Sequence, residues 1–356
     1  MRILVAAPRF PPDARSGAEQ ALQRLYRQAR LHHEVRLVAG WRSARDLVPA
    51  EAVAVELKGI GGARALARFG RVVRREVATW RPDVVLTGTA RLPPVGAPCA
   101  LLAQERDGEA PGGIRGRLRS RIEAARARAF DVVIAPTAAA ARAAVAAGLP
   151  ESRLRVIPNG IDERRFRPRP RPHVPGDDTV RILHVSRVVP GKGQHHAIDA
   201  VARLRRAHKA RAQLMVVGGV GDAVYLDQIR VQAYGQPVRF ALDVPDVVPF
   251  YDAADIVLLP TELPEASGLV AVEAMASGRP VVWFDHATVR ETTAGLGVPV
   301  PPGDVGALRD AISRLMDDPD ERQRLGERGR RYVLGNRTWG RTWSAYETAL
   351  QAIARP

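Results

Sequence analysis

Short apolar runs rich in β-branched residues alternate with helical stretches along most of this chain, and that alternation limits its fold more than any other feature. In the first half, the runs cover residues 2–7, 35–38, 53–57, 84–86, 100–102 and 132–135. Because these runs are mostly apolar and alternate with helix-length segments, they predict parallel strands in a sheet that is covered on both faces. The first half of the chain is therefore predicted to be a Rossmann-like domain.

A stretch rich in proline and arginine, residues 167–175, interrupts this pattern. The alternation then restarts with runs at residues 180–185, 213–217, 239–241, 256–259 and 280–283. A chain of 356 residues is long for one compact core, which also favours two domains. We therefore expect an N-terminal Rossmann-like domain over 1–166, a linker over 167–176 and a second Rossmann-like domain over 177–338.

The last residues, 339–356, predict a helix that packs back toward the N-terminal domain. Trp339, Trp343, Tyr346 and Leu350 fall at helical spacing on one face, and we interpret them as packing residues.

The net charge of +16 lies mostly in the first half and would attract anionic ligands, polyanions or acidic lipid surfaces. A nucleic-acid-binding protein is not expected, because the chain has no zinc-finger spacing or helix-turn-helix signature and only 5% aromatic residues. The single cysteine, Cys99, excludes internal disulfides. The chain shows no signal peptide and no long apolar span, so we expect a cytoplasmic protein.

The segment from Pro264 to Gly278 points to a ligand. Glu265 is predicted in a loop and Glu273 on the apolar helix that follows it. The amides at the start of that helix are unpaired donors at the positive end of the helix dipole, which suits a phosphate. Carboxylates on either side of an anion make sense if each accepts hydrogen bonds from hydroxyls of an attached sugar or ribose. The segment therefore predicts a sugar-nucleotide site.

The same segment resembles the paired-glutamate motif of the retaining glycosyltransferases of family 4, relatives of sucrose and glycogen synthases. Further segments similar to that family are residues 16–19, 131–137, 156–162, 184–193 and 301–304. The resemblance implies the α/β architecture called GT-B, in which two Rossmann-like parallel-sheet domains face a central cleft.

The resemblance assigns catalytic roles to Arg187, Lys192 and Glu265. Arg187 can bridge diphosphate oxygens with its planar fork while Lys192 adds a mobile point charge, so both offset the negative charge of the leaving group. Glu265 is expected to contact hydroxyls of the transferred sugar. These cations do the work of a metal, so we expect neither a metal ion nor a cofactor.

The remaining donor-binding residues that the resemblance implies are Gly17, Ser186, Gly219, Leu242, Val244, Ala266, Ser267, Gly268, Leu269, Val270 and Glu273. Glu273 is expected to accept both ribose hydroxyls. The base should rest near residues 242–247, where no side chain distinguishes uracil, guanine or thymine. We expect a UDP-sugar first and GDP-mannose second.

The acceptor side departs from the family. Many relatives carry a histidine after the strand that matches residues 100–103, whereas this chain has Gln104, Glu105 and Asp107 there as candidate acceptor-binding residues. The implied activity is metal-independent transfer of a hexose, with retention, to a hydroxyl of a small-molecule or lipid-linked acceptor.

Other interpretations remain at this stage. A sugar-nucleotide epimerase of the same architecture and a scaffold that binds the nucleotide sugar without catalysis would share the cleft. A phosphorylase would need a pyridoxal phosphate lysine, which three lysines make improbable. The basic, amphipathic residues 64–81 could lie on an anionic membrane, or could cover a sheet with the apolar stripe buried.

Overall fold

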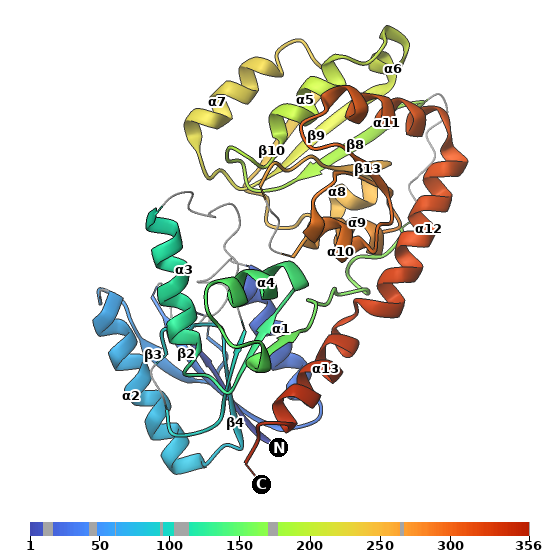
Figure 1. The fold of residues 1–356 in the computed structure, drawn as a ribbon. Helices are drawn as coiled ribbons and strands as arrows, with labels where there is room; N and C mark the ends of the chain where they lie inside the picture. The colour runs from blue at the N-terminus through green and yellow to red at the C-terminus, as the bar shows by residue number, and fades with distance from the viewer. Residues whose placement is uncertain are drawn as a thin grey trace. The chain divides into compact units, whose positions relative to one another are not determined.

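The computed structural model describes residues 1–9, 17–42, 48–60, 62–92, 95–102, 114–169, 177–263 and 267–355. The chain forms two compact units, each drawn in Figure 1. Unit 1 combines Met1–Gly160 with Trp339–Pro356, and unit 2 is Ile161–Thr338.

Unit 1 is built on a seven-stranded parallel sheet with the order β3-β2-β1-β4-β5-β6-β7. Its strands are β1 (Arg2–Ala7), β2 (Glu34–Trp41), β3 (Val53–Glu56), β4 (Val84–Thr87), β5 (Cys99–Leu102), β6 (Val132–Ala135) and β7 (Leu154–Val156). Its helices are α1 (Gly17–Ala29), α2 (Gly62–Trp80), α3 (Ile114–Ala127), α4 (Ala138–Ala146) and α13 (Trp339–Gln351).

Unit 2 is built on a six-stranded parallel sheet with the order β10-β9-β8-β11-β12-β13. Its strands are β8 (Val180–Val185), β9 (Ala212–Gly218), β10 (Val238–Leu242), β11 (Ile256–Leu259), β12 (Val281–Phe284) and β13 (Val298–Val300). Its helices are α5 (Gln194–Ala202), α6 (Arg206–Arg211), α7 (Ala223–Gln232), α8 (Val248–Ala253), α9 (Leu269–Ala276), α10 (Ala287–Thr293), α11 (Val305–Asp317) and α12 (Pro319–Asn336).

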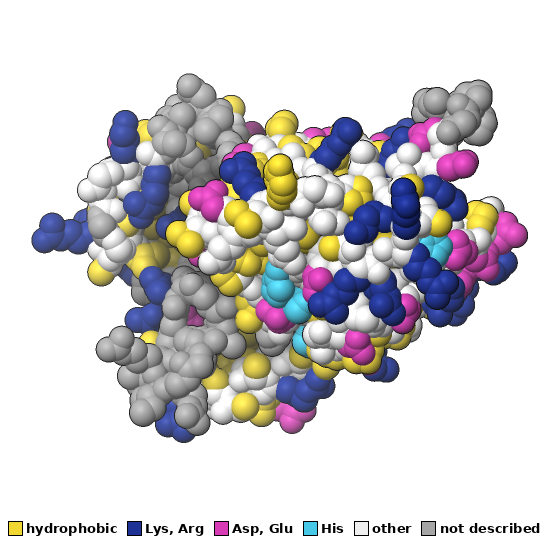
Figure 2. Space-filling model, turned by 90° about the horizontal axis from the view of Figure 1, so that it is seen from above, with side chains coloured by type: hydrophobic (Ala, Val, Ile, Leu, Met, Phe, Trp, Pro, Cys, Tyr) yellow, Lys and Arg dark blue, Asp and Glu magenta, His cyan; other side chains and the backbone are white. Residues whose placement is uncertain are grey.

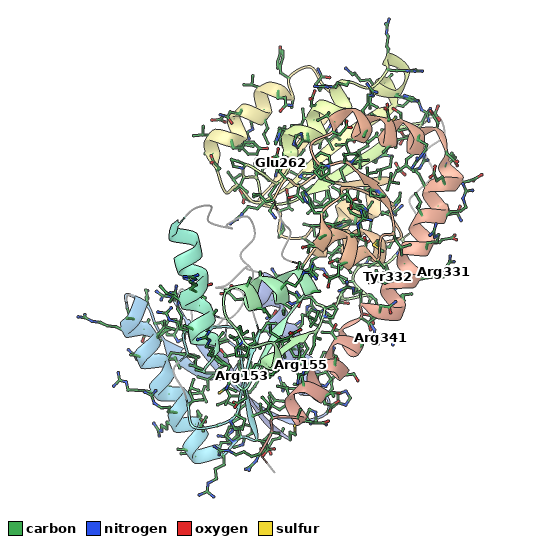
Figure 3. All side chains as sticks on the ribbon, in the orientation of Figure 1. Arg153, Arg155, Glu262, Arg331, Tyr332 and Arg341 are labelled. Atoms are coloured by element: carbon green, nitrogen blue, oxygen red, sulfur yellow. The ribbon has the colours of Figure 1, made fainter. Side chains whose placement is uncertain are left out.

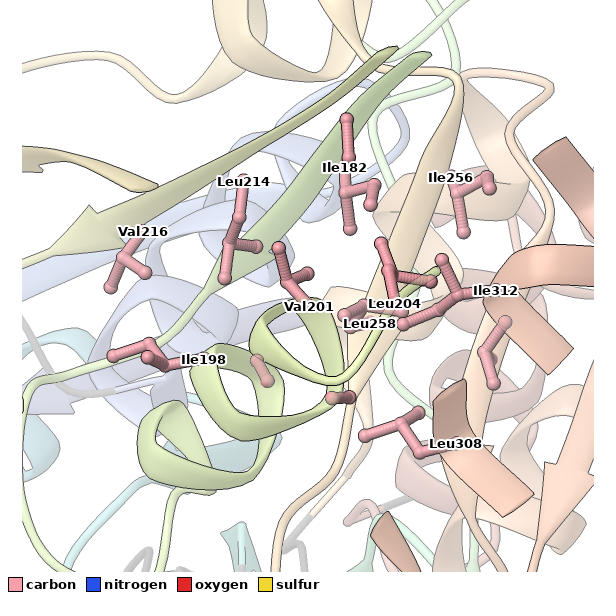
Figure 4. Close-up of a cluster of buried hydrophobic side chains, with 14 of the residues drawn as sticks. Ile182, Ile198, Val201, Leu204, Leu214, Val216, Ile256, Leu258, Leu308 and Ile312 are labelled. Atoms are coloured by element: carbon pink, nitrogen blue, oxygen red, sulfur yellow. The ribbon is translucent and has the colours of Figure 1, made fainter. Parts of the chain in front are cut away.

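The predicted fold class is confirmed, because both sheets are parallel and each has buried apolar clusters on its two faces. Figure 4 shows one of these clusters in unit 2, where Ile198 and Val201 of α5 meet strand residues such as Leu214. The strands that the sequence missed, β7 and β13, are three residues long and contain Arg155 or Pro299, so they lack an apolar run.

The boundary between the units lies at residue 160. The predicted first domain ended at 166, but Ile161 and Phe166 are buried in a core cluster of unit 2. Ile161 also pairs with Thr338 in an isolated bridge. Residues 167–169 of the predicted linker belong to unit 2, and residues 170–176 lie outside the described part of the chain.

Helix α13 packs on unit 1 as predicted. Trp343, Tyr346 and Leu350 are buried in the cluster that includes α1 and the sheet, with Trp339 partly buried beside them. Helix α2 likewise buries its apolar stripe, including Phe69, in the cluster on the other face of the sheet. Among the described residues, no helix combines the length and the apolar character needed to cross a membrane.

Candidate functional site

The order of strands in unit 2 creates a natural binding position. From β8 the chain proceeds outward to β9 and β10 on one side, and then returns to place β11 on the other side of β8. The chain therefore continues from β8 and from β11 toward opposite edges of the sheet, and ligands of open parallel sheets bind at such a switch point. Arg187 and Lys192 follow β8, and the segment that contains Glu265 follows β11.

Glycines hold the two loops against each other. Gly193 has φ +83°, and a Cβ atom there would lie 1.8 Å from the carbonyl oxygen of Pro260. The carbonyl of Gly191 accepts hydrogen bonds from the Glu262 amide at 2.9 Å and from the Thr261 hydroxyl at 3.2 Å. Lys192, between these glycines, is only 4% exposed. The cation predicted to bind phosphate is thus held by close backbone packing.

A buried polar network lies beneath the loop after β8. His184 is fully buried, and burial is the main cause that lowers its pKa to about 4. Its Nδ1 is 3.1 Å from the Leu258 carbonyl, which can only accept, so Nδ1 carries the proton. Its Nε2 must then accept from the Ser186 hydroxyl at 2.9 Å, which in turn accepts from Nε2 of Gln194 at 2.8 Å. Ser186, a predicted donor-binding residue, has its hydroxyl in this network.

The loops after β9 and β10 adjoin the loop after β8. Gly218 has φ +153°, and a Cβ atom there would lie 1.8 Å from the Ser186 carbonyl oxygen. The carbonyl of Gly219 accepts from the Val188 amide at 2.9 Å. Asp243 links the third loop, because its Oδ1 accepts from the Val220 amide at 3.3 Å. Hydrogen bonds thus connect the loops after β8, β9 and β10.

Two predicted base-binding residues flank Asp243 and are partly buried. Leu242 ends β10 and packs on one core cluster, whereas Val244 packs on another.

Helix α9 begins at an anion-binding geometry. Gly268 is its N-cap, with φ +58° and no side chain to satisfy the first amides of the helix. The Thr292 hydroxyl donates to the Ser267 carbonyl at 3.1 Å and fixes the segment before the cap. Leu269 and Val270 in the first turn are partly exposed. Among the described residues, no side chain caps the first amides of this helix, an arrangement that suits a negatively charged ligand.

Glu273 is a carboxyl with a strongly raised pKa. It lies one turn into α9 and accepts a hydrogen bond at 2.8 Å from the hydroxyl of Tyr251, which is fully buried. Burial raises the pKa of Glu273 to about 7, and the hydrogen bond from Tyr251 acts in the opposite direction. The ring of Phe166 packs edge-on against Tyr251, with ring centroids 5.6 Å apart. Glu273 is therefore a partly buried acceptor that the hydroxyl of Tyr251 holds in one orientation.

The structure describes only part of the predicted site. It brings Arg187, Lys192, Ser186 and Gly219 together on the adjoining loops of unit 2, and Gly17 begins α1 in unit 1. Five predicted residues lie outside the described part of the chain, and these are Gln104, Glu105, Asp107, Glu265 and Ala266.

Sequence reasoning missed the groups that position the site. Tyr251 gave no signal, because an isolated tyrosine near a strand is more often a packing residue. Gln194 and Tyr225, whose hydroxyl donates to Oε1 of Gln194 at 3.4 Å, are joined only by the fold. The adjacent histidines His195 and His196, immediately after the loop that follows β8, are a signal visible in the sequence for a candidate metal site.

Two family models together match most of the chain. The model described as "Glycosyl transferases group 1" matches residues 167–332, and the model "Glycosyltransferase Family 4" matches residues 15–165. The two matches meet near the boundary between the units.

Curated relatives match over part of their length. Glycogen synthase of Mycobacterium tuberculosis is 33% identical over 193 residues, which is 52% of this chain and 45% of that protein. MMP alpha-(1->4)-mannosyltransferase of Mycolicibacterium hassiacum is 30% identical over 222 residues, 56% of this chain and 50% of that protein. The chain thus spans about half the length of the curated relatives it matches.

Solved structures share the whole fold. Anabaena Alr3699/HepE in complex with UDP and glucose has a TM-score of 0.80 at 20% identity, covering 99% of this chain and 100% of that chain. WaaG, a glycosyltransferase involved in lipopolysaccharide biosynthesis, has a TM-score of 0.73 at 19% identity and covers 99% of each chain. At this level of identity, the similarity establishes the fold.

Proposed function

We propose, since this chain belongs to the group 1 and family 4 glycosyltransferases of GT-B fold, that it transfers a hexose from a nucleoside-diphosphate sugar to an acceptor hydroxyl. Transfer proceeds with retention of configuration and without a metal ion. The acceptor is a small molecule or a lipid-linked molecule.

The observation that carries the proposal is the position of Glu273, which lies one turn into α9 and accepts a hydrogen bond from Tyr251. A carboxylate with a pKa raised to about 7 is poorly solvated and gains strongly from further hydrogen-bond donors. The two hydroxyls of a ribose are such donors. The start of α9, one turn away, suits the diphosphate of the same ligand. A nucleotide thus satisfies both features of the helix.

The loop after β8 supplies the positive charge. As the bond between the sugar C1 and the diphosphate oxygen breaks, negative charge grows on the diphosphate, and Arg187 and Lys192 offset it. The new C1–O bond to the acceptor forms on the same face of the sugar. The acceptor's proton passes to an oxygen of the departing phosphate, so no protein base is required. Glu265 contacts hydroxyls of the transferred sugar in this proposal.

The donor is a UDP-sugar in the first instance and GDP-mannose in the second. The solved HepE structures are complexes with UDP, with UDP-glucose and with UDP and glucose. A relative from Corynebacterium glutamicum, 31% identical over 200 residues, is named a GDP-mannose-dependent mannosyltransferase. These names support the two donors only through similarity of sequence and fold, because Leu242 and Val244 are apolar and do not distinguish the bases.

Proton NMR of a reaction in EDTA tests the activity. With UDP-α-glucose, a panel of acceptor alcohols and wild-type enzyme, we expect an α-configured product, identified by the small coupling constant of its anomeric proton. Arg187→Ala should abolish product while the protein remains folded. A β-configured product would contradict retention, activity only with added divalent ions would contradict metal independence, and an epimerised donor without product would favour an epimerase.

A further inference from the structure

Two histidines and a glutamate form a cluster beside the donor loops that the proposed transfer does not use. His195 and His196 lie in the first turn of α5, and Glu262 lies in the loop after β11. Their ligating atoms lie within 4.8 Å of one another. Figure 3 labels Glu262 on unit 2, and Figure 2 shows histidine side chains beside acidic ones on one face of the molecule. We propose that His195, His196 and Glu262 bind one divalent transition-metal ion of the zinc class.

The distances fit such an ion. Oε1 of Glu262 is 2.8 Å from Nε2 of His196 and 3.5 Å from Nε2 of His195. Around a tetrahedral zinc ion, with bonds of about 2.1 Å, neighbouring ligand atoms are about 3.4 Å apart. Both distances to Glu262 are therefore close to the spacing of metal ligands, and the three ligating atoms all lie within 4.8 Å of one another. Two imidazoles and one carboxylate suit zinc, with water in the fourth position.

Hydrogen bonds behind His195 leave the correct nitrogen free for metal. Nε2 of Gln194 donates to the carbonyl of Arg187 at 2.9 Å, so Oε1 of Gln194 is the group that faces Tyr225. Because that oxygen can only accept, the single hydroxyl proton of Tyr225 is donated to it. Nδ1 of His195, 2.8 Å from the same hydroxyl oxygen, must then be the donor.

The proton of His195 is thus on Nδ1, and the lone pair of Nε2 is directed toward the side of Glu262. Nε2 lies 3.5 Å from Oε1 of Glu262, and a metal ion between the two atoms would replace the proton that otherwise links them. Histidine ligands of zinc commonly donate the other ring N–H to an oxygen, which fixes the tautomer and the ring. Tyr225 supplies that oxygen here.

The cluster is accessible to solvent, and it carries a negative charge that attracts a cation. The side chain of Glu262 is 44% exposed and that of His195 is 34% exposed, so an ion can enter from solvent. The positive end of α5 opposes a cation, but the Glu262 carboxylate offsets it at direct contact.

A bound ion would connect the two loops of the donor site. His195 follows Lys192 and Gly193 in sequence, and Glu262 immediately precedes the segment that contains Glu265. The Glu262 amide already donates to the Gly191 carbonyl. The ion adds a second link between the same loops, and it takes no part in the transfer chemistry.

The test uses the full-length chain without a histidine tag, first stripped of metal with EDTA. The protein is then titrated with cobalt(II) while its visible absorption is monitored. Wild type should bind one ion with the intense d–d bands of tetrahedral cobalt, and zinc should displace it. Glu262→Gln and His196→Ala should remove these bands. Tyr225→Phe, which removes only the hydroxyl behind His195, should weaken binding about tenfold or more. The matched control is His208→Ala, because His208 pairs with Asp317 at 2.9 Å elsewhere on unit 2 and should not matter.

Circular dichroism and the thermal midpoint in EDTA verify that each variant is folded. Glu262→Gln is the decisive variant, since its exposed side chain can change without loss of packing, whereas His196 packs against Phe284. The proposal is overturned if wild type gives only the spectrum of hydrated cobalt, or if folded Glu262→Gln binds the ion as wild type does. Neither result bears on glycosyl transfer, which is measured in EDTA.

Discussion

At the scale of single residues, the candidate site depends on side chains whose environment differs sharply from water. Glu273 is a carboxyl whose pKa lies near neutrality because of burial, and His184 is an imidazole that burial keeps neutral. Both groups have one defined hydrogen-bond arrangement, so each has a measurable consequence for binding or stability.

The first prediction concerns the pH dependence of donor binding. The carboxylate form of Glu273 accepts ribose hydroxyls, so affinity should approach its full value well above pH 7 and should fall as pH decreases through about 7. A nucleotide sugar is the correct probe, because its diphosphate does not titrate in this range, whereas the terminal phosphate of UDP does. Isothermal titration of the protein with the nucleotide sugar, repeated at pH values about one unit apart between about 5.5 and 8.5, measures how the affinity changes.

Two variants make this test specific. Glu273→Gln should bind weakly and without the pH dependence. Tyr251→Phe should move the midpoint to higher pH, because the lost hydrogen bond lowers the pKa of Glu273 in the wild type. An identical pH profile in Glu273→Gln would show that another group titrates.

The raised pKa also has a cost for the ligand-free protein. A carboxyl of folded pKa about 7 and ordinary value 4.5 stabilises the fold less as pH rises through that interval, since the unfolded chain releases its proton first. Ligand hydroxyls offset this loss, which is a reason for nucleotide to stabilise unit 2 most at alkaline pH.

A second prediction concerns the backbone of the donor loop. Gly193→Ala should lower the free energy of unfolding for two reasons. The left-handed φ costs about 1–2 kcal/mol for alanine, and the collision of its Cβ with the Pro260 carbonyl costs about 1–3 kcal/mol more. Gly235→Ala is the matched control, because Gly235 has φ +71° and open space around its Cβ position. Urea unfolding of unit 2 should show a clear excess for Gly193→Ala. Equal losses would mean that the contact with Pro260 is unimportant.

At the scale of elements, α13 is a helix that is remote in sequence from the core it completes. Leu350 and Tyr346 are fully buried against unit 1, and the Thr342 hydroxyl donates to the Pro158 carbonyl at 3.0 Å. Unit 1 therefore depends on the last residues of the chain for part of its hydrophobic cluster.

The single cysteine provides the measurement for α13. Cys99 lies in β5, and burial raises the pKa of its thiol to about 12, so it should react with thiol reagents only when unit 1 opens. Leu350→Ala should destabilise unit 1 by about 2–5 kcal/mol and accelerate labelling of Cys99 accordingly. Gln351→Ala, at an exposed neighbouring position, should leave the rate unchanged. An unchanged rate in Leu350→Ala would show that α13 does not stabilise the sheet.

The sequence predicted elements well where physical signals were local. The run at residues 256–259 is apolar throughout, and the face of Trp343, Tyr346 and Leu350 repeats at helical spacing, so these elements were found with nearly correct bounds. The helix after residue 268 was found because alanine-rich residues lie between two glycines. Strands β7 and β13 were missed, because pairing at a sheet edge does not require an apolar run.

The candidate site was less predictable for a different physical reason. Arg187 and Lys192 stand out in sequence as cations beside glycines, but their support comes from residues distant in the chain. The bond from Tyr251 to Glu273 and the contact between Gly193 and Pro260 arise only when strands become neighbours. Hydrogen-bond partners of this kind leave no spacing pattern in one sequence.

At the scale of the whole molecule, family and fold are established, and the remaining claim concerns what unit 2 binds. The basic excess of +16 attracts anions in general and cannot select a nucleotide. The apolar stripe of α2 is buried, so contact of this helix with an anionic membrane would depend on its arginines. Specificity must therefore come from the loops after β8 and β11 and from α9.

Thermal unfolding in EDTA, with UDP, GDP, dTDP and ADP and their common sugars, tests this claim most directly. A ligand that binds only the folded state raises the unfolding midpoint by mass action. We predict that one nucleotide series, UDP first, stabilises wild type and that Glu273→Ala loses about 2–4 kcal/mol of that binding. No stabilisation of wild type by any nucleotide, or equal stabilisation of Glu273→Ala, would contradict the assignment of the donor site.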